Sequence, residues 1–374
     1  MSLKKKIKKL IILYPSFERG GVEKNLINFI NFCDDQKIQI YLISNINKES
    51  QKKLFNKNIN FVSIRLSSSI KLFKRLFTSI TSIISLIDLF KSIKKKDSLI
   101  ISFQSHIFPI LICKLFNRKI ILRNSEDILD ATKYADNKIS ALFIFMLKIF
   151  FYNFSNGIIT NSIKSKKSLD LVVFNKNKNK LIYNPYLYKI SNFKKQSRKN
   201  IILSVGRLCK QKNQETTIKA FSIFLKKFPN YKLILIGDGQ DRYKLKKLCM
   251  KLKISKNVVF KGWVLDIKKY YLQSKILIFP SLYEGLPNTL IEAINYNLPC
   301  ISSSCSGASD ILTKKYGSFS PRNNYVLLSK KMTDSILNYK KTLLFTQIIK
   351  KKLSRFLIKP QVLKYLSYCN SILD

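Results

Sequence analysis

Short apolar runs alternate along the chain with longer segments in which apolar residues recur at helical spacing. The runs predict strands in the first half at residues 9–14, 38–44, 60–64, 98–103, 118–123 and 157–161. They predict strands in the second half at residues 200–205, 232–236, 257–261, 275–280 and 299–303. Strands that alternate with helical segments are typical of parallel sheets. The sequence therefore predicts two successive open α/β sheets.

A polar stretch separates the two sets of predicted strands. It begins at Asn184 and Pro185 and continues to the lysine-rich residues around 194–200, where we expect a hinge. We therefore predict a first Rossmann-like domain over residues 1–185 and a second over residues 196–355. Ligands of such sheets bind at the carboxyl ends of the strands. Two domains facing each other across a hinge would thus place a donor and an acceptor on opposite walls of one cleft.

The charge balance is the most unusual feature of the composition. Of 374 residues, 69 are Lys or Arg and 21 are Asp or Glu, which gives a net charge of +48. This excess raises the hypothesis of a basic nucleic-acid-binding protein. The cations are dispersed, however, and no nucleic-acid-binding module is recognisable. A lysine-rich bias over all exposed faces, helped by an anionic membrane surface, explains the charge better, so we expect no nucleic-acid partner.

The cysteines, the single histidine and the lengths of the apolar segments indicate where the protein is located and which sites it lacks. Seven scattered cysteines without a Cys-x-x-Cys pair are typical of a reducing compartment, and a single histidine excludes a His-rich metal site. The longest apolar stretch, residues 141–154, is interrupted by Lys148 and Asn153 and is shorter than the roughly 20 residues of a transmembrane helix. The apolar run after the basic N-terminus is too short for a signal sequence. We therefore expect a cytoplasmic protein.

Glycine is scarce and marks the loops. The chain has 10 glycines, whereas average usage gives about 26. Such a composition keeps glycine where the backbone needs a positive φ or the close approach of a ligand. Most of these glycines follow a predicted strand, which indicates that ligands bind at the strand-end loops.

The richest polar pattern follows the fourth predicted strand of the second half. A loop carries Glu284 and Gly285, and Asn288 or Thr289 is placed to cap the helix that follows. The free N–H groups and the positive dipole end of a helix start bind phosphate and other anions. Acidic residues near a helix start are often plain electrostatic caps. Glu284 and Glu292 together could also accept hydrogen bonds from sugar or ribose hydroxyls.

A second polar loop follows the strand at residues 200–205. Gly206 ends this strand, and the cations Arg207, Lys210 and Lys212 come next. Three cations at a strand end can neutralise a diphosphate through charge-assisted hydrogen bonds. In a chain with 69 cations, many loops also hold cations by chance. No Asp-x-Asp pair is present to hold a divalent metal on a diphosphate, so we expect neither a metal nor another cofactor.

Weaker candidates follow strands of the first half. Gly20 and Gly21 form a strand-to-helix pair whose backbone could approach a phosphate. His106 follows the strand at residues 98–103, and both a polar acceptor-site role and a structural role are open for it. Polar residues after the next strand share this wall and could contact an acceptor or only cap the loop: Arg123, Asn124 and Glu126.

Residues 71–96 have apolar residues at helical spacing and cations at both ends. Such a helix could lie on an anionic membrane surface. It could also pack on a sheet with its charged ends in solvent, and the sequence leaves both interpretations open. Residues 325–374 also have a helical pattern, in which Pro360 predicts a break.

The two loops of the second half together resemble the large family of GT-B retaining glycosyltransferases called family 4. Glu284 and Glu292 match the family's Glu-x7-Glu motif. Gly206, Arg207 and Lys212 match its Gly-Arg-Leu…Lys element. The resemblance covers most of the chain and is strongest in the second half.

Two further segments carry the resemblance. Gly20, Gly21 and Glu23 match the N-terminal Gly-Gly-x-Glu motif, and residues 182–185 resemble the interdomain segment. The resemblance also implies that the last helix, at about 358–374, crosses back and packs on the first domain.

Two positions depart from the family pattern. Residues 306–310 stand where many members have Gly-x-Pro-x-Glu, and Asn213 replaces the usual glycine after Lys212.

The resemblance implies a role for each matching residue. Arg207 and Lys212 would bind the donor diphosphate and, with Glu284 at the donor sugar, form the catalytic group. Glu292 would bind the ribose hydroxyls, and Gly21 would lie near the phosphates from the first domain. Other positions would complete the donor site, with Gly262 near the base: Gly20, Gly206, Gly262, Gly285, Leu286, Pro287 and Asn288.

The implied function is metal-independent transfer of a sugar from a UDP- or GDP-sugar to an acceptor hydroxyl, with retention at the anomeric carbon. The expected acceptor is a lipid-linked glycan in lipopolysaccharide, O-antigen, capsule or other surface-glycan synthesis. The expected location is cytoplasmic, peripheral on the inner face of the membrane. Two alternatives stay open: a sugar-nucleotide epimerase of the same architecture, which the scarcity of His and Asp disfavours, and the basic nucleic-acid-binding protein.

Overall fold

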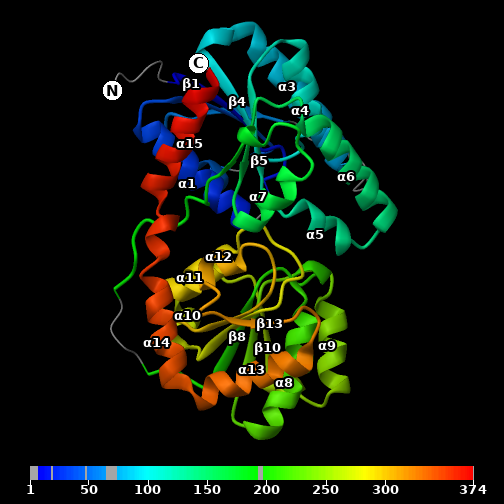
Figure 1. The fold of residues 1–374 in the computed structure, drawn as a ribbon, viewed down its shortest axis with the longest axis vertical. Helices are drawn as coiled ribbons and strands as arrows, with labels where there is room; N and C mark the ends of the chain where they lie inside the picture. Colours follow the sequence, from blue (N-terminus) through cyan, green and yellow to red (C-terminus); the bar gives the residue numbers. More distant parts are fainter. Residues whose placement is uncertain (1–6, 18–19, 47–48, 65–73, 193–196, 374) are drawn as a thin grey trace. The chain divides into compact units, whose positions relative to one another are not determined.

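The computed structural model describes residues 7–17, 20–46, 49–64, 74–192 and 197–373. The chain divides into two units (Figure 1). Unit 1 comprises Met1–Ile128, Asn137–Tyr188 and Phe356–Asp374. Unit 2 comprises Leu129–Asp136 and Lys189–Arg355. The short segment Leu129–Asp136 therefore belongs to unit 2 although unit 1 surrounds it in the sequence.

Sheet 1 lies in unit 1 and contains seven parallel strands in the described part of the chain. These strands are β1 (Lys9–Leu13), β2 (Gln39–Ser44), β3 (Asn60–Ser63), β4 (Ser98–Ser102), β5 (Ile120–Asn124), β6 (Gly157–Thr160) and β7 (Asn179–Leu181). Their order is β3-β2-β1-β4-β5-β6-β7. The chain therefore builds the sheet outward from β1 in one direction and then, from β4, in the other.

Sheet 2 lies in unit 2 and contains six parallel strands among the described residues. These strands are β8 (Ile201–Val205), β9 (Lys232–Ile236), β10 (Val258–Gly262), β11 (Ile276–Phe279), β12 (Cys300–Ser303) and β13 (Ser318–Ser320). Their order, β10-β9-β8-β11-β12-β13, reverses direction in the same way, between β8 and β11.

All eleven predicted strands are confirmed, with ends that differ by one or two residues. The two strands that sequence reasoning missed are β7 and β13, each of three residues at a sheet edge. Both contain polar residues, because an edge strand has only one neighbour and is less buried. A hydrophobic run therefore does not mark them.

Helices connect the strands in both units. Those of unit 1 are α1 (Gly21–Asp35), α2 (Glu49–Lys52), α3 (Lys74–Ser92), α4 (Ile107–Leu115), α6 (Lys138–Tyr152), α7 (Ile163–Asp170) and α15 (Ile358–Leu373), while α5 (Ile128–Lys133) lies at the boundary. Those of unit 2 are α8 (Gln214–Lys227), α9 (Arg242–Lys251), α10 (Lys268–Gln273), α11 (Asn288–Asn295), α12 (Ala308–Leu312), α13 (Tyr325–Leu337) and α14 (Tyr339–Lys350). None of the helices in the described ranges is both long and apolar enough to cross a membrane.

The period-two alternation of β1 gives sheet 1 two buried faces. Leu10 and Ile12 contribute to one apolar cluster, and Ile11 and Leu13 to the other. Such strands, buried on both faces, are typical of parallel sheets with helices on each side. The helices α1 and α15 cover the first face, while α3, α4 and α6 contribute to the cluster on the second.

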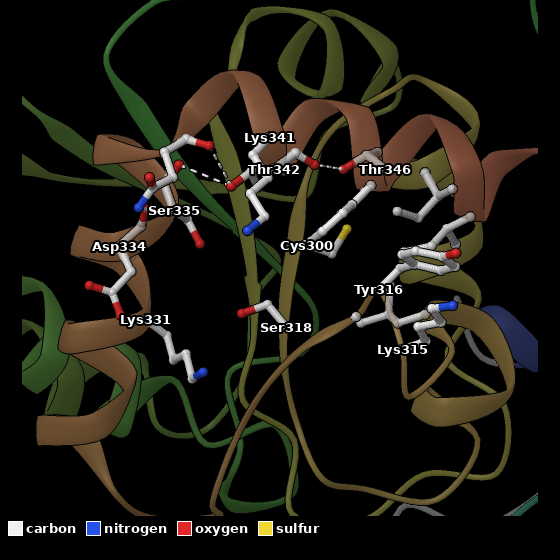
Figure 2. A pocket seen from close by; sticks show the side chains of 16 residues that line it. Cys300, Lys315, Tyr316, Ser318, Lys331, Asp334, Ser335, Lys341, Thr342 and Thr346 are labelled. Carbon is white, nitrogen blue, oxygen red and sulfur yellow. Dashed lines mark hydrogen bonds between the residues drawn. The ribbon is translucent and has the colours of Figure 1, made fainter.

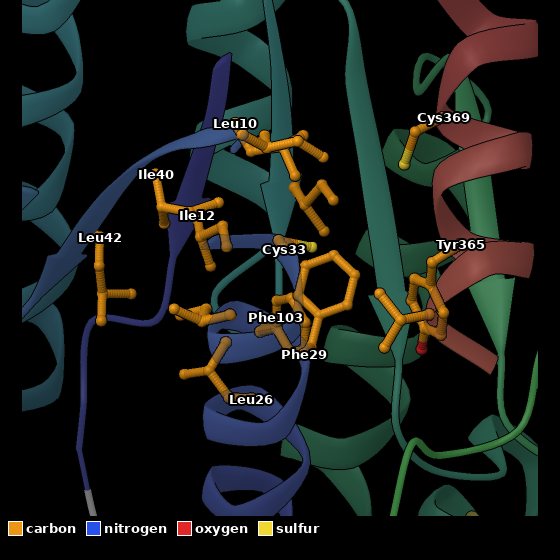
Figure 3. Packing of buried hydrophobic residues seen from close by; sticks show 14 of the residues in the cluster. Leu10, Ile12, Leu26, Phe29, Cys33, Ile40, Leu42, Phe103, Tyr365 and Cys369 are labelled. Atoms are coloured by element: carbon orange, nitrogen blue, oxygen red, sulfur yellow. The ribbon is translucent and has the colours of Figure 1, made fainter. Parts of the chain in front are cut away.

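The last helix, α15, is part of the core of unit 1 (Figure 3). Phe29 of α1 packs against both Tyr365 of α15 and Phe103, at ring-centroid distances of 5.2 and 6.0 Å. The helical pattern is interrupted, as Pro360 predicts, but the break lies between α14 and α15 and therefore before this proline. Pro360 occupies the first turn of α15, where its missing N–H removes no intrahelical hydrogen bond.

Helix α3 lies within the predicted amphipathic segment 71–96. Leu86, Phe90 and Ile93 are buried in the second cluster of unit 1, which shows that this helix packs on the sheet. Residues 71–73 lie outside the described residues. Contact of this helix with a membrane stays a prediction.

Candidate functional site

In an open parallel sheet, ligands bind beside the carboxyl ends of the two strands between which the strand order reverses. In sheet 2 these strands are β8 and β11, and in sheet 1 they are β1 and β4. We call these positions the switch point of sheet 2 and the switch point of sheet 1. The predicted cation loop follows β8 and the predicted glutamate loop follows β11, so the topology brings both to one switch point.

Lys212 and Glu284 meet at the switch point of sheet 2. Lys212 ends a short 3-10 helix (Lys210–Lys212) after β8, and Glu284 lies in the loop after β11. Lys212 Nζ donates a hydrogen bond to Glu284 Oε1 in a close ion pair. The two side chains are only 18% and 12% exposed. The pair is therefore partly shielded from water, where charge–charge interactions are stronger than on an open surface.

Backbone contacts hold the two loops together beside this ion pair. The N–H of Leu282 donates to the carbonyl of Gln211 over 2.8 Å, and Gln211 Nε2 donates to the carbonyl of Tyr283 over 3.0 Å. Asn213 Nδ2 donates to the carbonyl of Pro280 over 3.3 Å. Asn213 has a φ of 53°, a left-handed conformation that asparagine adopts more readily than most residues. Asparagine can therefore replace the usual glycine here.

Glycines of two neighbouring loops support the switch point. A Cβ on Gly237 would lie 2.1 Å from the carbonyl oxygen of Gly206, and one on Gly239 would lie 2.4 Å from that of Leu208. In the sequence, Gly237-Asp238-Gly239 after a strand is typical of a turn. Their role in packing the loop after β9 against the cation loop becomes visible in the tertiary structure, because β8 and β9 are neighbours.

The segment that departs from the family pattern, residues 306–310, supports the glutamate loop. A Cβ on Gly307, whose φ is 74°, would lie 2.0 Å from the carbonyl oxygen of Gly285. The loop after β12 therefore packs directly on the backbone next to Glu284.

Glu292 is held by a residue that sequence reasoning missed. Its Oε2 accepts a hydrogen bond of 2.7 Å from the hydroxyl of Tyr271, a buried side chain of α10 that stacks on Tyr296. No local signal marks Tyr271, since it is 21 residues from Glu292 in the sequence. The prediction that Asn288 or Thr289 caps α11 is wrong: Pro287 occupies the N-cap and makes no side-chain cap.

Arg207 and Gly262 lie on other loops of sheet 2. The Arg207 side chain is exposed and has no hydrogen bond or ion pair with the described residues, while its carbonyl accepts from Gln214 Nε2 over 3.0 Å. Gly262 ends β10 with a φ of 66°, and its carbonyl accepts from the N–H of Gly237 over 2.8 Å. The roles predicted for both in donor binding stay predictions.

Cys305 lies close enough to sense the charges of Lys212 and Glu284. Burial, and next the Glu284 carboxylate, raise the pKa of the Cys305 thiol to about 12. This thiol is therefore neutral at physiological pH and is neither a nucleophile nor a metal ligand in that form. Within the described ranges, no three His, Cys, Asp or Glu side chains are grouped as a metal site requires.

The switch point of sheet 1 joins the predicted glycine pair and the histidine loop. The N–H of Ser16 donates to Gln104 Oε1 over 3.4 Å, and the N–H of Phe103 donates to the carbonyl of Leu13 over 2.9 Å. Gly20 is the N-cap of α1, and its N–H donates to Glu23 Oε2 over 3.1 Å. A Cβ on Gly20 would meet none of the described atoms within 4 Å. Packing therefore does not demand a glycine at this position.

His106 follows β4 and contacts two neighbours. Its Nδ1 lies 2.9 Å from the hydroxyl of Ser102, and its ring meets the ring of Tyr152 edge-on at 5.7 Å. Burial, and then the charges of Lys148 and Arg123, lower the pKa of His106 to about 3. The imidazole is therefore neutral at physiological pH and can act there as a hydrogen-bond group.

Arg123 is fully buried and bonded to neutral groups. Its Nη2 donates to Asn184 Oδ1 over 2.6 Å, its Nε donates to the Tyr365 hydroxyl over 3.3 Å, and its Nη1 bonds to Ser125. The guanidinium also lies over the ring of Phe103. These bonds join β5, the predicted interdomain segment and α15. Arg123 therefore has a structural role, while its contact with an acceptor stays a prediction.

Asn124 is the last residue of β5, and Glu126 lies in the loop that follows it. Asn124 Nδ2 donates to the carbonyl of Glu126 over 2.5 Å, and the Glu126 carboxylate pairs with Lys148 of α6 at 2.6 Å. These bonds show that the residues order the loop. Their predicted contact with an acceptor is not tested by this geometry.

A separate cavity of about 370 Å³ lies in unit 2 beside α13 and α14 (Figure 2). Lys315, Lys331 and Lys341 supply positive charge to its lining, together with Asp334 and Tyr316. No predicted site residue lines it. The cavity is therefore distinct from the Lys212–Glu284 pair.

Comparisons with known proteins agree with this architecture. Residues 189–352 match the family described as Glycosyl transferases group 1. An uncharacterized glycosyltransferase of Methanocaldococcus jannaschii is 36% identical over 220 residues, which cover 54% of this chain and 53% of that protein. A Campylobacter jejuni α-1,4-N-acetyl-D-galactosaminyltransferase, named for an undecaprenol-linked glycan, is 34% identical over 42% of this chain and 45% of its own.

The chain spans about half the length of these curated relatives. The crystal structure of HepE from Anabaena in complex with UDP and glucose is similar over 97% of this chain and all of its own, with a TM-score of 0.78 at 17% identity. The fold-class prediction is confirmed. The chain has the GT-B fold of two Rossmann-like domains, and its residues 189–352 carry the sequence pattern of group 1 glycosyl transferases.

Proposed function

We propose that this chain is a retaining glycosyltransferase that uses a UDP- or GDP-sugar and needs no metal. The observation that carries the proposal is the Lys212–Glu284 ion pair, formed by side chains 72 residues apart at the switch point of sheet 2. The similarity of residues 189–352 to group 1 glycosyl transferases supports it, as does the fold shared with a UDP-bound protein.

The ion pair offers hydrogen-bond donors for the phosphates of a nucleotide sugar and an acceptor for its sugar hydroxyls. An ammonium group has three N–H donors, and Glu284 occupies one of those on Lys212. The remaining donors suit phosphate oxygens, and the second oxygen of Glu284 suits a sugar hydroxyl. Arg207, exposed on the same loop, would add a second cation. Glu292, oriented by Tyr271, would accept hydrogen bonds from the ribose.

In the proposed reaction the bond between the anomeric carbon and the donor phosphate breaks, and a bond to the acceptor oxygen forms on the same face. The acceptor proton passes to an oxygen of the departing diphosphate. Lys212 and Arg207 would stabilise the negative charge that grows on this leaving group. The pKa of about 12 keeps the Cys305 thiol protonated at physiological pH, so it does not act there as a thiolate nucleophile.

We propose a lipid-linked glycan as the acceptor, because one relative is named for transfer to an undecaprenol-linked glycan. The enzyme would then act at the inner face of the membrane in surface-glycan synthesis. The predicted contacts of Gly20 and Gly21 with donor phosphates, and of His106 with the acceptor, stay predictions.

A thermal-shift titration with UDP, GDP and their sugars tests donor binding, in buffer containing a metal chelator. A nucleotide at about 100 times its Kd stabilises the chain by about 2.7 kcal/mol. We expect one nucleotide class to stabilise the wild type and to stabilise Lys212→Ala much less. Stabilisation that appears only when a divalent metal is added would contradict metal independence.

Product analysis separates the alternatives. Transfer requires an acceptor, whereas an epimerase releases a free sugar or its epimer without one. A nucleic-acid-binding protein would bind duplex or single strands with a steep salt dependence and would ignore nucleotide sugars.

A further inference from the structure

Helix α6 is apolar on two opposite sides. On one side, Phe145 and Phe151 pack against the cluster of unit 1 that also contains Tyr152. The other side forms what we call the α6 face, with large apolar side chains that are 55% to 83% exposed: Ile139, Leu142, Phe143, Met146 and Phe150. Their spacing places them along one stripe of the helix. A helix that is apolar all round is normally buried, so the exposure of this stripe requires an explanation.

Neighbouring elements extend the α6 face. Helix α4 contacts α6 and exposes Phe108, Leu111 and Leu115. Figure 1 shows α3, α4 and α6 on the same side of unit 1. At the other end of α6, Asn153 Oδ1 accepts from the N–H of Phe174 over 2.8 Å, and Phe174 is itself 89% exposed. Apolar surface of this extent marks contact with a membrane or a protein.

The stretches of chain that carry α4 and the α6 face are rich in lysine and free of acidic residues. Residues 98–125 and 137–169 contain no Asp or Glu. Lys114 of α4 and Lys138 of α6 are exposed. The acidic residues that follow these stretches are already paired, Glu126 with Lys148 at 2.6 Å and Asp170 with Lys166 at 2.5 Å. Asp136, which precedes α6, is paired with Lys210, and Asp88 of α3 is paired with Lys91. An apolar stripe flanked by exposed lysines is complementary to a bilayer surface, where anionic headgroups lie above the acyl chains.

We infer that the α6 face docks on an anionic lipid bilayer, with its apolar side chains at the acyl boundary and its lysines among the headgroups. With 15 residues, α6 would lie in the plane of the surface rather than cross it. A second copy of the chain is the less favourable partner, since its basic border would face Lys114 and Lys138 with charge of the same sign. The inference names the surface for the membrane location given in the proposed function, but its test requires no donor, acceptor or catalysis.

Vesicle flotation with the full chain tests this inference. The probes are vesicles of phosphatidylcholine alone and of phosphatidylcholine mixed with phosphatidylglycerol. The test variant combines Leu142→Ser, Phe143→Ser and Met146→Ser, and circular dichroism checks that it folds. The matched control combines Met250→Ser, Leu337→Ser and Leu344→Ser, three side chains of unit 2 with similar exposure of 54% to 61%.

We expect the wild type and the control to float with the anionic vesicles. The test variant should bind these vesicles at least about tenfold more weakly. Replacing Lys114 and Lys138 by Gln should weaken binding to anionic vesicles only. Equal binding by the test variant and the wild type would overturn the inference. So would a wild-type dimer that the test variant converts to a monomer, because the face would then join two copies. Nucleotide-induced thermal shifts, measured separately, report on the proposed function alone.

Discussion

Both sheets of this chain carry cations at the ends of their strands, but these cations differ in burial and in their partners between the two units. In unit 2, Lys212 pairs with the Glu284 carboxylate at the switch point of sheet 2, and both side chains keep some exposure. In unit 1, Arg123 lies near the end of β5, the neighbour of β4, and is enclosed by Asn184, Tyr365 and Phe103. A cation after a strand is therefore not by itself evidence of a binding site. Its burial and its partners separate a structural group from one that can meet a ligand.

This comparison predicts that substitution of Arg123 lowers stability, whereas substitution of Lys212 lowers activity. The largest effect is expected for Arg123→Met. The substitution removes the Arg123 hydrogen bonds to Ser125, Asn184 and the Tyr365 hydroxyl and leaves the buried Asn184 Oδ1 with only a 3.4 Å bond from Asn161. This should lower the free energy of unfolding by about 3 kcal/mol. Chemical denaturation measures it. Arg207→Met is the matched control, because that exposed side chain should change stability by less than about 0.5 kcal/mol. Equal stability of both variants would contradict the structural role of Arg123.

The second effect concerns activity. Lys212→Ala removes a charge-assisted contact with the donor phosphates, so kcat/KM should fall about 10- to 150-fold. Lys210→Ala is the control, since Lys210 lies on the same loop and pairs with Asp136 in a largely exposed ion pair. Its removal should change kcat/KM by less than about threefold. Steady-state kinetics with a saturating acceptor measure both variants. Wild-type turnover in Lys212→Ala would show that Lys212 has no part in the mechanism.

The third effect depends on pH and concerns His106. Its pKa is about 3 in the folded chain and about 6.5 when unfolded, so the unfolded chain binds more protons between these values. Stability should therefore fall as the pH decreases from 6.5 toward 3, by at most about 1.4 kcal/mol per pH unit from this group. His106→Gln should flatten this part of the stability profile. The free energy of unfolding of both proteins is measured by denaturation at pH 7 and pH 5. An equal loss of stability in the wild type and in His106→Gln would show that His106 is not held neutral.

The smallest effect is expected for Tyr271→Phe. Loss of the 2.7 Å bond to Glu292 should weaken donor binding about 2- to 10-fold, because one neutral-to-charged hydrogen bond is lost while the buried ring remains. Nucleotide titration measures this change, and Tyr243→Phe, at an exposed tyrosine, serves as the control. Tyr271→Phe should affect donor binding more than stability, whereas Arg123→Met should affect stability more than binding. Measuring both quantities for both variants separates a site residue from a structural one.

The eleven longer strands follow from the sequence alone, because their apolar runs are local and a buried parallel strand needs little else. It also placed Lys212 and Glu284 after strands, since each position depends only on the strand before it. The exact start of α11 and the helical position of Pro360 were missed, because local capping signals allow several starts within one turn.

The tertiary structure decided what these local patterns combine to make. The strand order that sets β8 beside β11, and so joins Lys212 to Glu284, depends on pairing between residues far apart in the chain. The same holds for the approach of Gly237 to Gly206 and for the bond from Tyr271 to Glu292. Burial is likewise a property of the packed chain. The sequence contains Arg123 and the apolar stretch 141–154, but only packing encloses Arg123 and leaves a face of α6 exposed.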